Sequence, residues 1–168
     1  VDLHNRLIEK GIPGNKINTD WSSLVQFKKT FTEPVPLQKE EAFKKQGIDS
    51  YHGRAYFYNE STIVIGEDKL EGKNIVIATG AKPRELNIPG KKYLTTSREF
   101  MEIKKLPENI VFVGGGYISF EFAHIAARAG SKCIILQRGG QPLKNFDSDL
   151  VNDLIKSSKL EGIEVYTD

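Results

Sequence analysis

Apolar runs alternate with helical repeats over the last third of the chain. Residues 110–113 form an apolar run, a glycine-rich turn follows, and small and apolar residues then recur at helical spacing as far as Gly130. A second strand pattern covers 132–137, a helical repeat covers 147–160, and a third short strand pattern covers 163–166. This order predicts strand, helix, strand, helix, strand, which is one mononucleotide-binding half of a doubly wound α/β fold.

The first part of the chain has a different pattern. Thr19 is expected to cap a helix that carries Trp21, and a second helix is expected from about Pro36 to Gly47. β-Branched and aromatic residues then gather in three short runs separated by turn residues, at 49–52, 54–58 and 61–65. Runs of this kind predict an antiparallel β-meander.

A buried-strand pattern follows the meander. Residues 74–80 read NIVIATG, a run of β-branched and small residues that ends in Ala78, Thr79 and Gly80. The pattern predicts a core strand whose small terminal residues allow close approach of the backbone to a cofactor. A tight turn after a core strand, with no ligand, fits the same residues equally well.

The turn after residue 113 carries the strongest chemical signal. Gly114, Gly116 and Ser119 follow the G-x-G-x-x-G pattern, with serine at the third place, where glycine or alanine is usual. Gly114 lets the chain turn out of the strand, and the missing side chain of Gly116 lets backbone N–H groups approach a diphosphate at the positive end of the next helix. The strand before the motif and the helix and strand after it are the context that a dinucleotide site requires.

The residue that selects the coenzyme is expected at the end of the second strand. An acidic residue about 20 positions after the motif usually accepts hydrogen bonds from the adenosine ribose. Here position 137 is glutamine and position 138 is arginine. Arg138 and Lys144 are therefore candidates to bind a ribose 2′-phosphate, which favours NADP(H) over NAD(H). A solvated basic loop without a ligand is the alternative.

The order of these motifs resembles the pyridine nucleotide-disulfide oxidoreductases, the flavoproteins of the glutathione reductase, mercuric reductase and dihydrolipoamide dehydrogenase type. The resemblance rests on the ATG strand, the IPG turn at 88–90, a helical segment that ends at Pro107 and the GGGYIS turn. It implies a partial Rossmann-like α/β fold of three layers that binds FAD and NAD(P), with an antiparallel β-meander in the first part. Residues 1–105 would be part of the FAD domain, and residues 106–168 the first half of the NAD(P) domain.

The resemblance also assigns roles to residues. Tyr117 matches an aromatic gate over the flavin, and Glu121 matches a carboxylate that reaches toward the flavin edge. Because apolar residues flank Glu121, its charge must be paired or lie at the wet edge of the helix, and we expect it to be paired. The expected cofactor-binding residues are Gly114, Gly116, Ile118, Ser119, Arg138 and Lys144 for NAD(P), and Arg54, Ala55, Ala78, Thr79, Gly80 and Ser97 for FAD.

Several family features have no counterpart in the sequence. The first G-x-G-x-x-G turn, the Cys-x4-Cys redox pair and the C-terminal dimerisation domain are missing, so we expect a central piece of the enzyme that is inactive alone. The single cysteine, Cys133, lies in an apolar strand and is expected to be a core residue. His4, His52 and His124 are expected to be surface or packing residues.

Composition narrows the partners and the location. The chain has 24 Lys and Arg against 22 Asp and Glu, a net charge of +2, so no extended basic surface is expected for nucleic acid. We expect no metal site, no membrane association and a reducing cytoplasm. The expected partners are a small-molecule or disulfide substrate and a second copy of the chain, because uncovered strand edges and apolar faces favour self-association.

The sequence thus predicts part of an FAD-dependent NAD(P)H oxidoreductase that passes electrons from nicotinamide through flavin to a disulfide or a similar acceptor. Two alternatives remain open. One is a flavoprotein without catalytic cysteines, of the NADH oxidase or ferredoxin reductase type. The other is a module that binds NAD(P)H and catalyses no reaction.

Overall fold

The computed structural model describes residues 2–15, 17 and 19–168 and divides the chain into two compact units. The first unit combines the chain up to Lys28 with Thr95–Asp168, and the second is Lys29–Leu94. The elements are α1 (Asp2–Glu9), α2 (Trp21–Thr32), α3 (Val35–Lys45), β1 (Ala55–Phe57), β2 (Thr62–Ile65), β3 (Asp68–Glu71), η1 (Lys91–Tyr93), α4 (Ser97–Phe100), β4 (Asn109–Val113), α5 (Tyr117–Arg128), β5 (Lys132–Gln137), α6 (Ser148–Leu160) and β6 (Ile163–Thr167).

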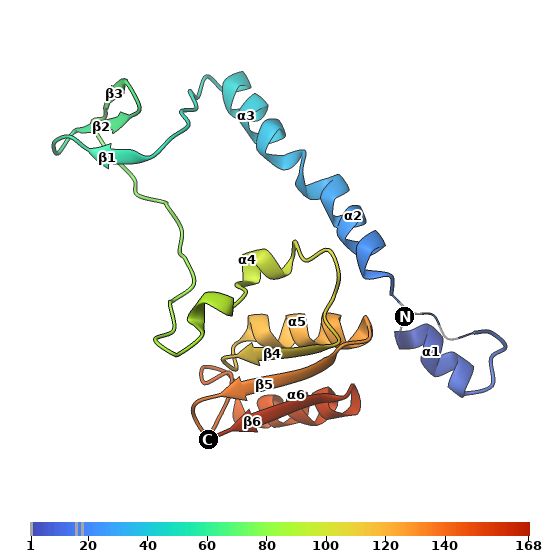
Figure 1. Ribbon diagram of the computed structural model, residues 1–168. Coiled ribbons are helices and arrows are strands. Elements are labelled where there is room, and N and C mark those ends of the chain that lie inside the picture. The colour runs from blue at the N-terminus through green and yellow to red at the C-terminus, as the bar shows by residue number, and fades with distance from the viewer. Residues whose placement is uncertain (1, 16, 18) are drawn as a thin grey trace. The chain divides into compact units, whose positions relative to one another are not determined.

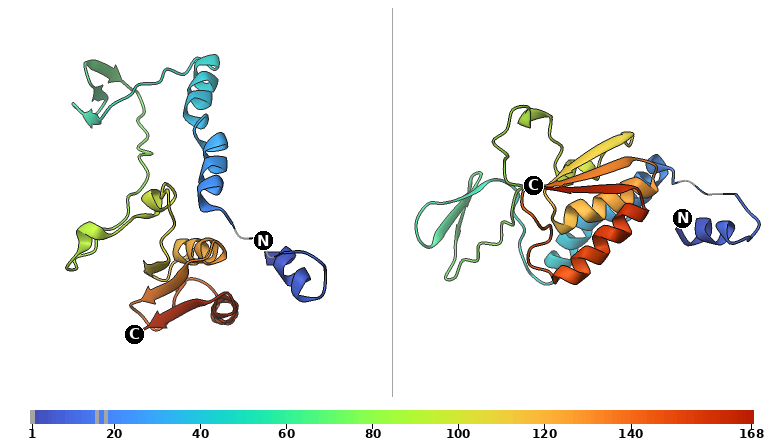
Figure 2. Two further views of the ribbon diagram at one scale, coloured as in Figure 1. Left: turned by 45° about the vertical axis from the view of Figure 1, so that its right-hand side comes forward. Right: turned by 90° about the horizontal axis from the view of Figure 1, so that it is seen from below.

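A three-stranded parallel sheet forms the centre of the first unit. Its strand order is β4-β5-β6, and Ile110 is paired with Cys133, which in turn is paired with Ile163. Helices α5 and α6 connect successive strands and cover one face of the sheet (Figure 1 and Figure 2). The predicted order of strand, helix, strand, helix, strand is confirmed, and with it the partial Rossmann-like α/β class.

The two faces of this sheet differ in burial because side chains alternate along each strand. Cys133, Ile135 and Ile163 point to the helical face and are at most 1% exposed. On the other face, large apolar side chains stay in contact with solvent, namely Val111, Val113, Leu136 and Tyr166. Parallel sheets are normally covered on both faces, so the described residues cover only half of this sheet.

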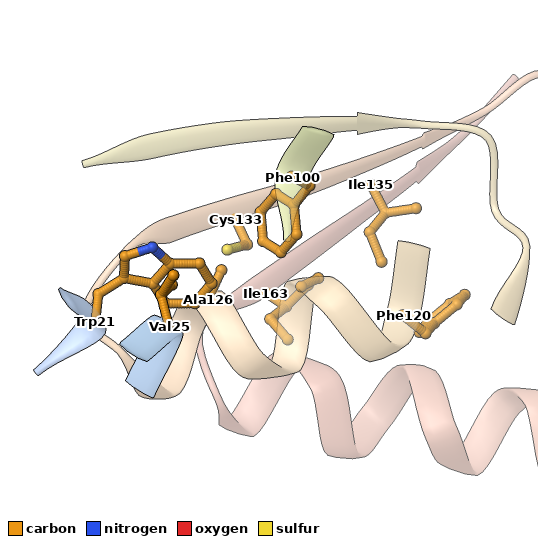
Figure 3. Packing of buried hydrophobic residues seen from close by; sticks show 9 residues of the cluster. Trp21, Val25, Phe100, Phe120, Ala126, Cys133, Ile135 and Ile163 are labelled. Atoms are coloured by element: carbon orange, nitrogen blue, oxygen red, sulfur yellow. The ribbon is translucent and has the colours of Figure 1, made fainter. Parts of the chain in front are cut away.

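An aromatic cluster closes one end of the helical layer. Trp21 and Val25 of α2 are buried in one core with Phe100, Ala126 and Cys133 (Figure 3). The indole Nε1 of Trp21 donates a hydrogen bond of 2.7 Å to the carbonyl oxygen of residue 103. Helix α2 is thereby fixed to the segment that follows α4.

Helix α4 is shorter than the sequence predicts. The helical pattern up to Pro107 suggested a long segment, but the helix covers only Ser97–Phe100. A capping box between Thr96 and Glu99 starts it, and the Thr96 backbone N–H lowers the pKa of the Glu99 carboxyl. Beyond the end of the helix, side chains of α2 bind two backbone carbonyl oxygens. Lys28 Nζ donates to the carbonyl oxygen of Met101, and Trp21 Nε1 donates to the carbonyl oxygen of Ile103.

The helices before the meander are close to prediction, with two differences, the residue that caps α2 and the presence of α1. Asp20, not Thr19, caps α2, since its carboxylate accepts from the backbone N–H of Ser22 at 3.1 Å and the Ser23 hydroxyl holds its pKa below the usual value. Helix α3 ends before Gly47, which has a φ of 74°. Helix α1 was not predicted from the sequence.

The predicted meander exists, but its strands are shifted along the chain. β1 pairs with β2 and β2 with β3, all antiparallel (Figure 1). Residues 49–52 form no strand, and β3 was missed because its sequence, DKLE, carries a single apolar residue. A two-residue turn made of Gly66, with a φ of 62°, and Glu67 pairs Ile65 with Asp68 and sets the register of β3.

The prediction of a buried strand at 74–80 is wrong for this structure. These residues have no regular secondary structure, and the side chains of Val76 and Ile77 are 86% and 70% exposed. A strand needs a paired neighbour, and no strand in the described part of the chain pairs with this segment. The apolar pattern therefore exists without the sheet that would bury it.

Candidate functional site

The glycine-rich turn lies between β4 and α5, at the carboxyl end of the parallel sheet. Gly114 has a φ of 105°, a conformation that other residues rarely adopt, and its N–H donates to the carbonyl oxygen of Leu136 at 2.8 Å. A β-carbon added to Gly114 or Gly116 would meet no atom within 4 Å. The outer side of the turn therefore opens to free space, as a site for a bulky phosphate group requires.

The first turn of α5 faces the same space. Gly116 is the residue before the helix, and it provides no side-chain hydrogen bond to the first helical N–H groups. These groups, at Tyr117 and Ile118, carry the positive end of the helix dipole. An anion placed here would be bound by backbone N–H groups. Ser119, whose N–H bonds to the carbonyl oxygen of Gly116 at 3.1 Å, closes the turn.

The middle glycine of the turn has a packing role that the sequence reasoning missed. Gly115 is buried, and a β-carbon on it would lie 2.6 Å from Cβ of Pro142. The N–H of Leu143 donates to the Gly115 carbonyl oxygen at 2.9 Å. The loop after β5 is therefore folded back onto the turn, with the Pro142 ring against Gly115.

Gln137 connects the same two segments from the end of β5. Its Oε1 accepts a hydrogen bond from the Gly115 N–H at 2.9 Å, and its Nε2 donates to the carbonyl oxygen of Gln141 at 3.4 Å. Gln137 occupies the place where an acidic residue usually binds the ribose. The sequence marked this position as lacking an acid but did not reveal the double hydrogen bond.

The two candidate cations lie on this loop. Arg138 and Lys144 are both exposed. A β-carbon on Gly139 would lie 3.5 Å from Nζ of Lys144, so Lys144 folds back toward the residue next to Arg138. The structure thus brings the two predicted cations to one loop beside the glycine turn, where two positive charges attract a phosphate group.

Tyr117 and Glu121 border an open apolar groove of about 490 Å³ between α5 and α6. Its lining consists of Tyr117, Phe120, Glu121, His124, Leu143, Phe146, Leu150, Val151 and Leu154. Tyr117 is 60% exposed, and Glu121 is exposed as well. Because Glu121 is exposed, water can solvate its charge. The expectation that Glu121 is paired depended on its burial and therefore loses its basis. The assigned roles of both residues toward the flavin remain predictions.

His124 takes part in a hydrogen-bond network. The Arg128 guanidinium contacts its Nδ1 at 2.8 Å, and because a guanidinium only donates, Nδ1 must accept. The other nitrogen, Nε2, lies 3.0 Å from the Ser158 hydroxyl, which itself donates to the Leu154 carbonyl oxygen. These contacts link α5 to α6, and the expected packing role of His124 fits them.

The residues expected at FAD are divided between the two units. Arg54 precedes β1, Ala55 is its first residue and pairs with Ile65, and 78–80 lie in the exposed segment after the meander. Gly80 has a φ of 73°. Ser97 begins α4 and belongs to the first unit, as Tyr117 and Glu121 do. Among the described residues of either unit taken alone, no complete flavin site is gathered.

Cys133 is a core residue, as expected. It is 1% exposed, and burial raises the pKa of its thiol to about 11. Within the described residues, no group of three or more His, Cys, Asp or Glu side chains is arranged to hold a metal ion. No helix there combines the length and the apolar character needed to cross a membrane.

The Cys133 thiol is expected to resist modification in the folded protein. At pH 8 almost all of it is protonated, and the thiolate is the reactive form. Native protein should react with dithiobis(nitrobenzoic acid) at least a hundredfold more slowly than protein in 6 M urea, about the loss expected from a pKa rise of two or more units. Because the protonated thiol is favoured in the fold, its stabilising contribution is complete below about pH 8.5 and is lost as the pH rises toward 11. Equal rates in native and denatured protein would contradict the burial of this thiol.

Comparisons with known proteins agree with this geometry. Residues 9–168 match the family described as pyridine nucleotide-disulphide oxidoreductase. The chain is 33% identical over 158 residues to dihydrolipoyl dehydrogenase of Acholeplasma laidlawii, an alignment that covers 90% of this chain and 47% of that protein. It is 34% identical over 122 residues to glutathione reductase of Nostoc sp., with 73% of this chain and 27% of that protein covered.

A solved structure gives the same result. The HOCl-induced flavoprotein disulfide reductase RclA from Escherichia coli superposes with a TM-score of 0.81 and 26% identity, over 89% of this chain and 36% of that chain. The chain spans between a quarter and a half of the length of the curated relatives it matches. With the family match extending over almost its whole length, the chain belongs to the pyridine nucleotide-disulphide oxidoreductase family.

Proposed function

We propose that this chain is part of an enzyme that uses FAD and NAD(P)H to reduce a disulfide or a similar acceptor. The observation that carries the proposal is the open glycine turn at the amino end of α5, set at the carboxyl edge of a parallel sheet. Bound nicotinamide and flavin would supply hydride and electron transfer. For the whole protein, we further propose a disulfide or similar electron acceptor, a homodimer as the active form and a cytoplasmic location.

The chain's own residues bind and orient in this proposal. Backbone N–H groups at Gly116, Tyr117 and Ile118 would hold the diphosphate, with Gly114 and Ser119 shaping the turn. Tyr117 and Glu121 lie on the first two turns of the same helix. With the diphosphate bound at the start of this helix, both side chains would lie on the side of the nicotinamide and the flavin. The open space beside Gly114 and Gly116 is compatible with such a ligand.

The flavin side of the proposal rests on the family and on fewer contacts. Residues 1–105 would form part of the FAD domain and residues 106–168 half of the NAD(P) domain. Within the first part, the segments that would meet FAD contain Arg54 with Ala55, residues 78–80, and Ser97. Full-length protein should carry a yellow flavin whose visible absorbance bleaches on addition of NADPH. Colourless protein that still binds nucleotide would instead support a sensor.

A flavoprotein without catalytic cysteines is the second candidate, and Cys133 itself is not a redox thiol. The only thiol of this chain is buried, and its pKa is raised to about 11. It is therefore unsuited to redox exchange. Counting the thiols of full-length protein before and after reduction by NADPH separates the two candidates. Two new thiols per flavin support the disulfide enzyme, and none supports the alternative.

Arg138→Ala tests the preference for NADP(H). A charge-assisted contact to phosphate contributes about 1.5–3 kcal/mol. The variant should therefore bind adenosine 2′,5′-bisphosphate at least tenfold more weakly and AMP, which lacks the 2′-phosphate, with unchanged affinity. Titration calorimetry measures both dissociation constants. Arg84→Ala, at an exposed arginine of the second unit, is the control. Unchanged affinity for the bisphosphate in the Arg138 variant would contradict the proposed phosphate site.

A further inference from the structure

Both backbone groups of Gly115 are hydrogen-bonded, one to the last residue of β5 and the other to the loop that follows it. The N–H donates to Oε1 of Gln137, and the carbonyl oxygen accepts from the N–H of Leu143. Gln137 also donates to the carbonyl oxygen of Gln141. We call the pair of hydrogen bonds from Gly115 through the Gln137 amide to Gln141 the Gln137 bridge. It links the diphosphate turn directly to the loop that carries the two cations.

The bridge requires a side chain that offers an acceptor to Gly115 and a donor to Gln141. A glutamine side chain presents one acceptor oxygen and one donor nitrogen. A carboxylate at the same position could accept from the Gly115 N–H, but its second oxygen would face the Gln141 carbonyl oxygen without a proton between them. An aliphatic side chain could form neither bond and would leave the buried N–H of Gly115 unpaired.

Along the chain, the bridge also lies next to both candidate cations. Arg138 follows Gln137 directly, and Lys144 folds back to within 3.5 Å of a β-carbon position on Gly139. Gln137 is neutral and partly buried. It therefore holds the cationic loop against the turn without adding a negative charge that would repel a phosphate.

We infer that Gln137 is a positioning residue that sets the preference for a 2′-phosphorylated nucleotide, an inference that rests on the proposed function. The bridge fixes the spacing between the turn that binds the 5′-phosphate and the loop that binds the 2′-phosphate. AMP needs only the turn, whereas adenosine 2′,5′-bisphosphate needs both. Loss of the bridge should therefore weaken the bisphosphate more than AMP.

Two variants of the 168-residue chain separate geometry from charge. Gln137→Leu removes both hydrogen bonds without a change in charge, and Gln137→Glu retains one bond and adds a negative charge. The ratio of the two dissociation constants, AMP over adenosine 2′,5′-bisphosphate, should fall at least fivefold in Gln137→Leu and further in Gln137→Glu. Asn145→Leu, which removes an exposed amide from the same loop, should leave the ratio within twofold of wild type.

Amide hydrogen exchange without nucleotide gives a second readout. The N–H of Gly115 should exchange at least tenfold faster in Gln137→Leu than in wild type, and it should remain protected in Gln137→Glu. The N–H of Leu143 should lose protection in both variants. These measurements also establish that each variant is folded, because protection in β5 should not change.

The outcomes are distinct. A ratio that falls only in Gln137→Glu would show that charge alone matters and would overturn the positioning role, as would an unchanged ratio in both variants. Equal weakening of AMP and the bisphosphate would assign Gln137 to stability of the turn and would also overturn it. Wild-type protein that binds AMP but gains nothing from the 2′-phosphate would overturn this inference and leave the diphosphate site intact. Binding of neither nucleotide would overturn both.

Discussion

Gly115→Ala is expected to lower both the stability of the first unit and its affinity for nucleotide, whereas Gly116→Ala lowers only the affinity. A β-carbon on Gly115 would lie 2.6 Å from Cβ of Pro142, whose ring is fully buried and cannot rotate away. Overpacking of this kind costs about 1–3 kcal/mol. The loop that carries Lys144 must move, so its contact with a ligand is lost as well.

The neighbouring glycine has free space instead of a packed ring. A β-carbon on Gly116 would meet nothing within 4 Å, and the φ of −86° suits alanine. The free energy of unfolding should therefore change by less than about 0.5 kcal/mol. The added methyl group would, however, occupy the space through which a diphosphate approaches the backbone. Loss of about 3 kcal/mol of charge-assisted hydrogen bonding corresponds to roughly a hundredfold weaker nucleotide binding.

Denaturant titration followed by fluorescence of Trp21, together with calorimetric titration of AMP, measures the two quantities separately. Trp21 is the only tryptophan of the chain and is buried in the first unit, so its emission reports unfolding of that unit. Gly116→Ala that retained wild-type affinity would place the phosphate elsewhere. Gly115→Ala with unchanged stability would contradict the packing of Pro142 against the turn.

This pair of glycines illustrates how much of the site the sequence could predict. The motif identified Gly114 and Gly116 because their function depends on local backbone geometry, which the spacing of the motif encodes. Gly115 and Gln137 act through contacts with residues more than 20 positions away. No local pattern carries that information, since it arises only when the loop after β5 folds back onto the turn.

The same distinction explains the accuracy of the fold prediction. The parallel sheet was predictable because its apolar runs form strands that the chain itself pairs, β4 with β5 and β5 with β6. The segment at 74–80 has an equally apolar pattern, yet all its residues except the half-buried Ile75 are exposed, because no described strand pairs with it. Hydrophobic pattern predicts the tendency to form a strand, but pairing and burial decide the result.

Phe100→Ala is expected to destabilise the first unit more than any other substitution considered above. Phe100 is 5% exposed and packs edge to face on Trp21 and Phe112, with ring centroids 5.7 and 5.8 Å apart, and stacks on Phe122 at 4.6 Å. It thus connects α2, β4 and α5. Removal of a buried phenylalanine ring costs about 3–5 kcal/mol, from lost apolar burial and from the cavity left behind.

A loss of this size is a large share of the 5–15 kcal/mol, roughly, that stabilises an ordinary domain. With a urea dependence of about 2 kcal/mol per molar, the midpoint of the Trp21 fluorescence transition should fall by about 2 M. Phe100→Leu keeps most of the volume and should lose about half as much, which provides a measurement if the alanine variant does not fold.

Phe146→Ala is the matched control, because it removes the same ring from a side chain that is 57% exposed. It should change the free energy of unfolding by less than about 1 kcal/mol. Trp21 emission should also shift to longer wavelength in folded Phe100→Leu but not in folded Phe146→Ala, since only Phe100 contacts the indole in this pair. Equal destabilisation by the two alanine variants would mean that α2 does not pack on Phe100 in solution, and the aromatic cluster would lose its role as the connection between α2 and the parallel sheet.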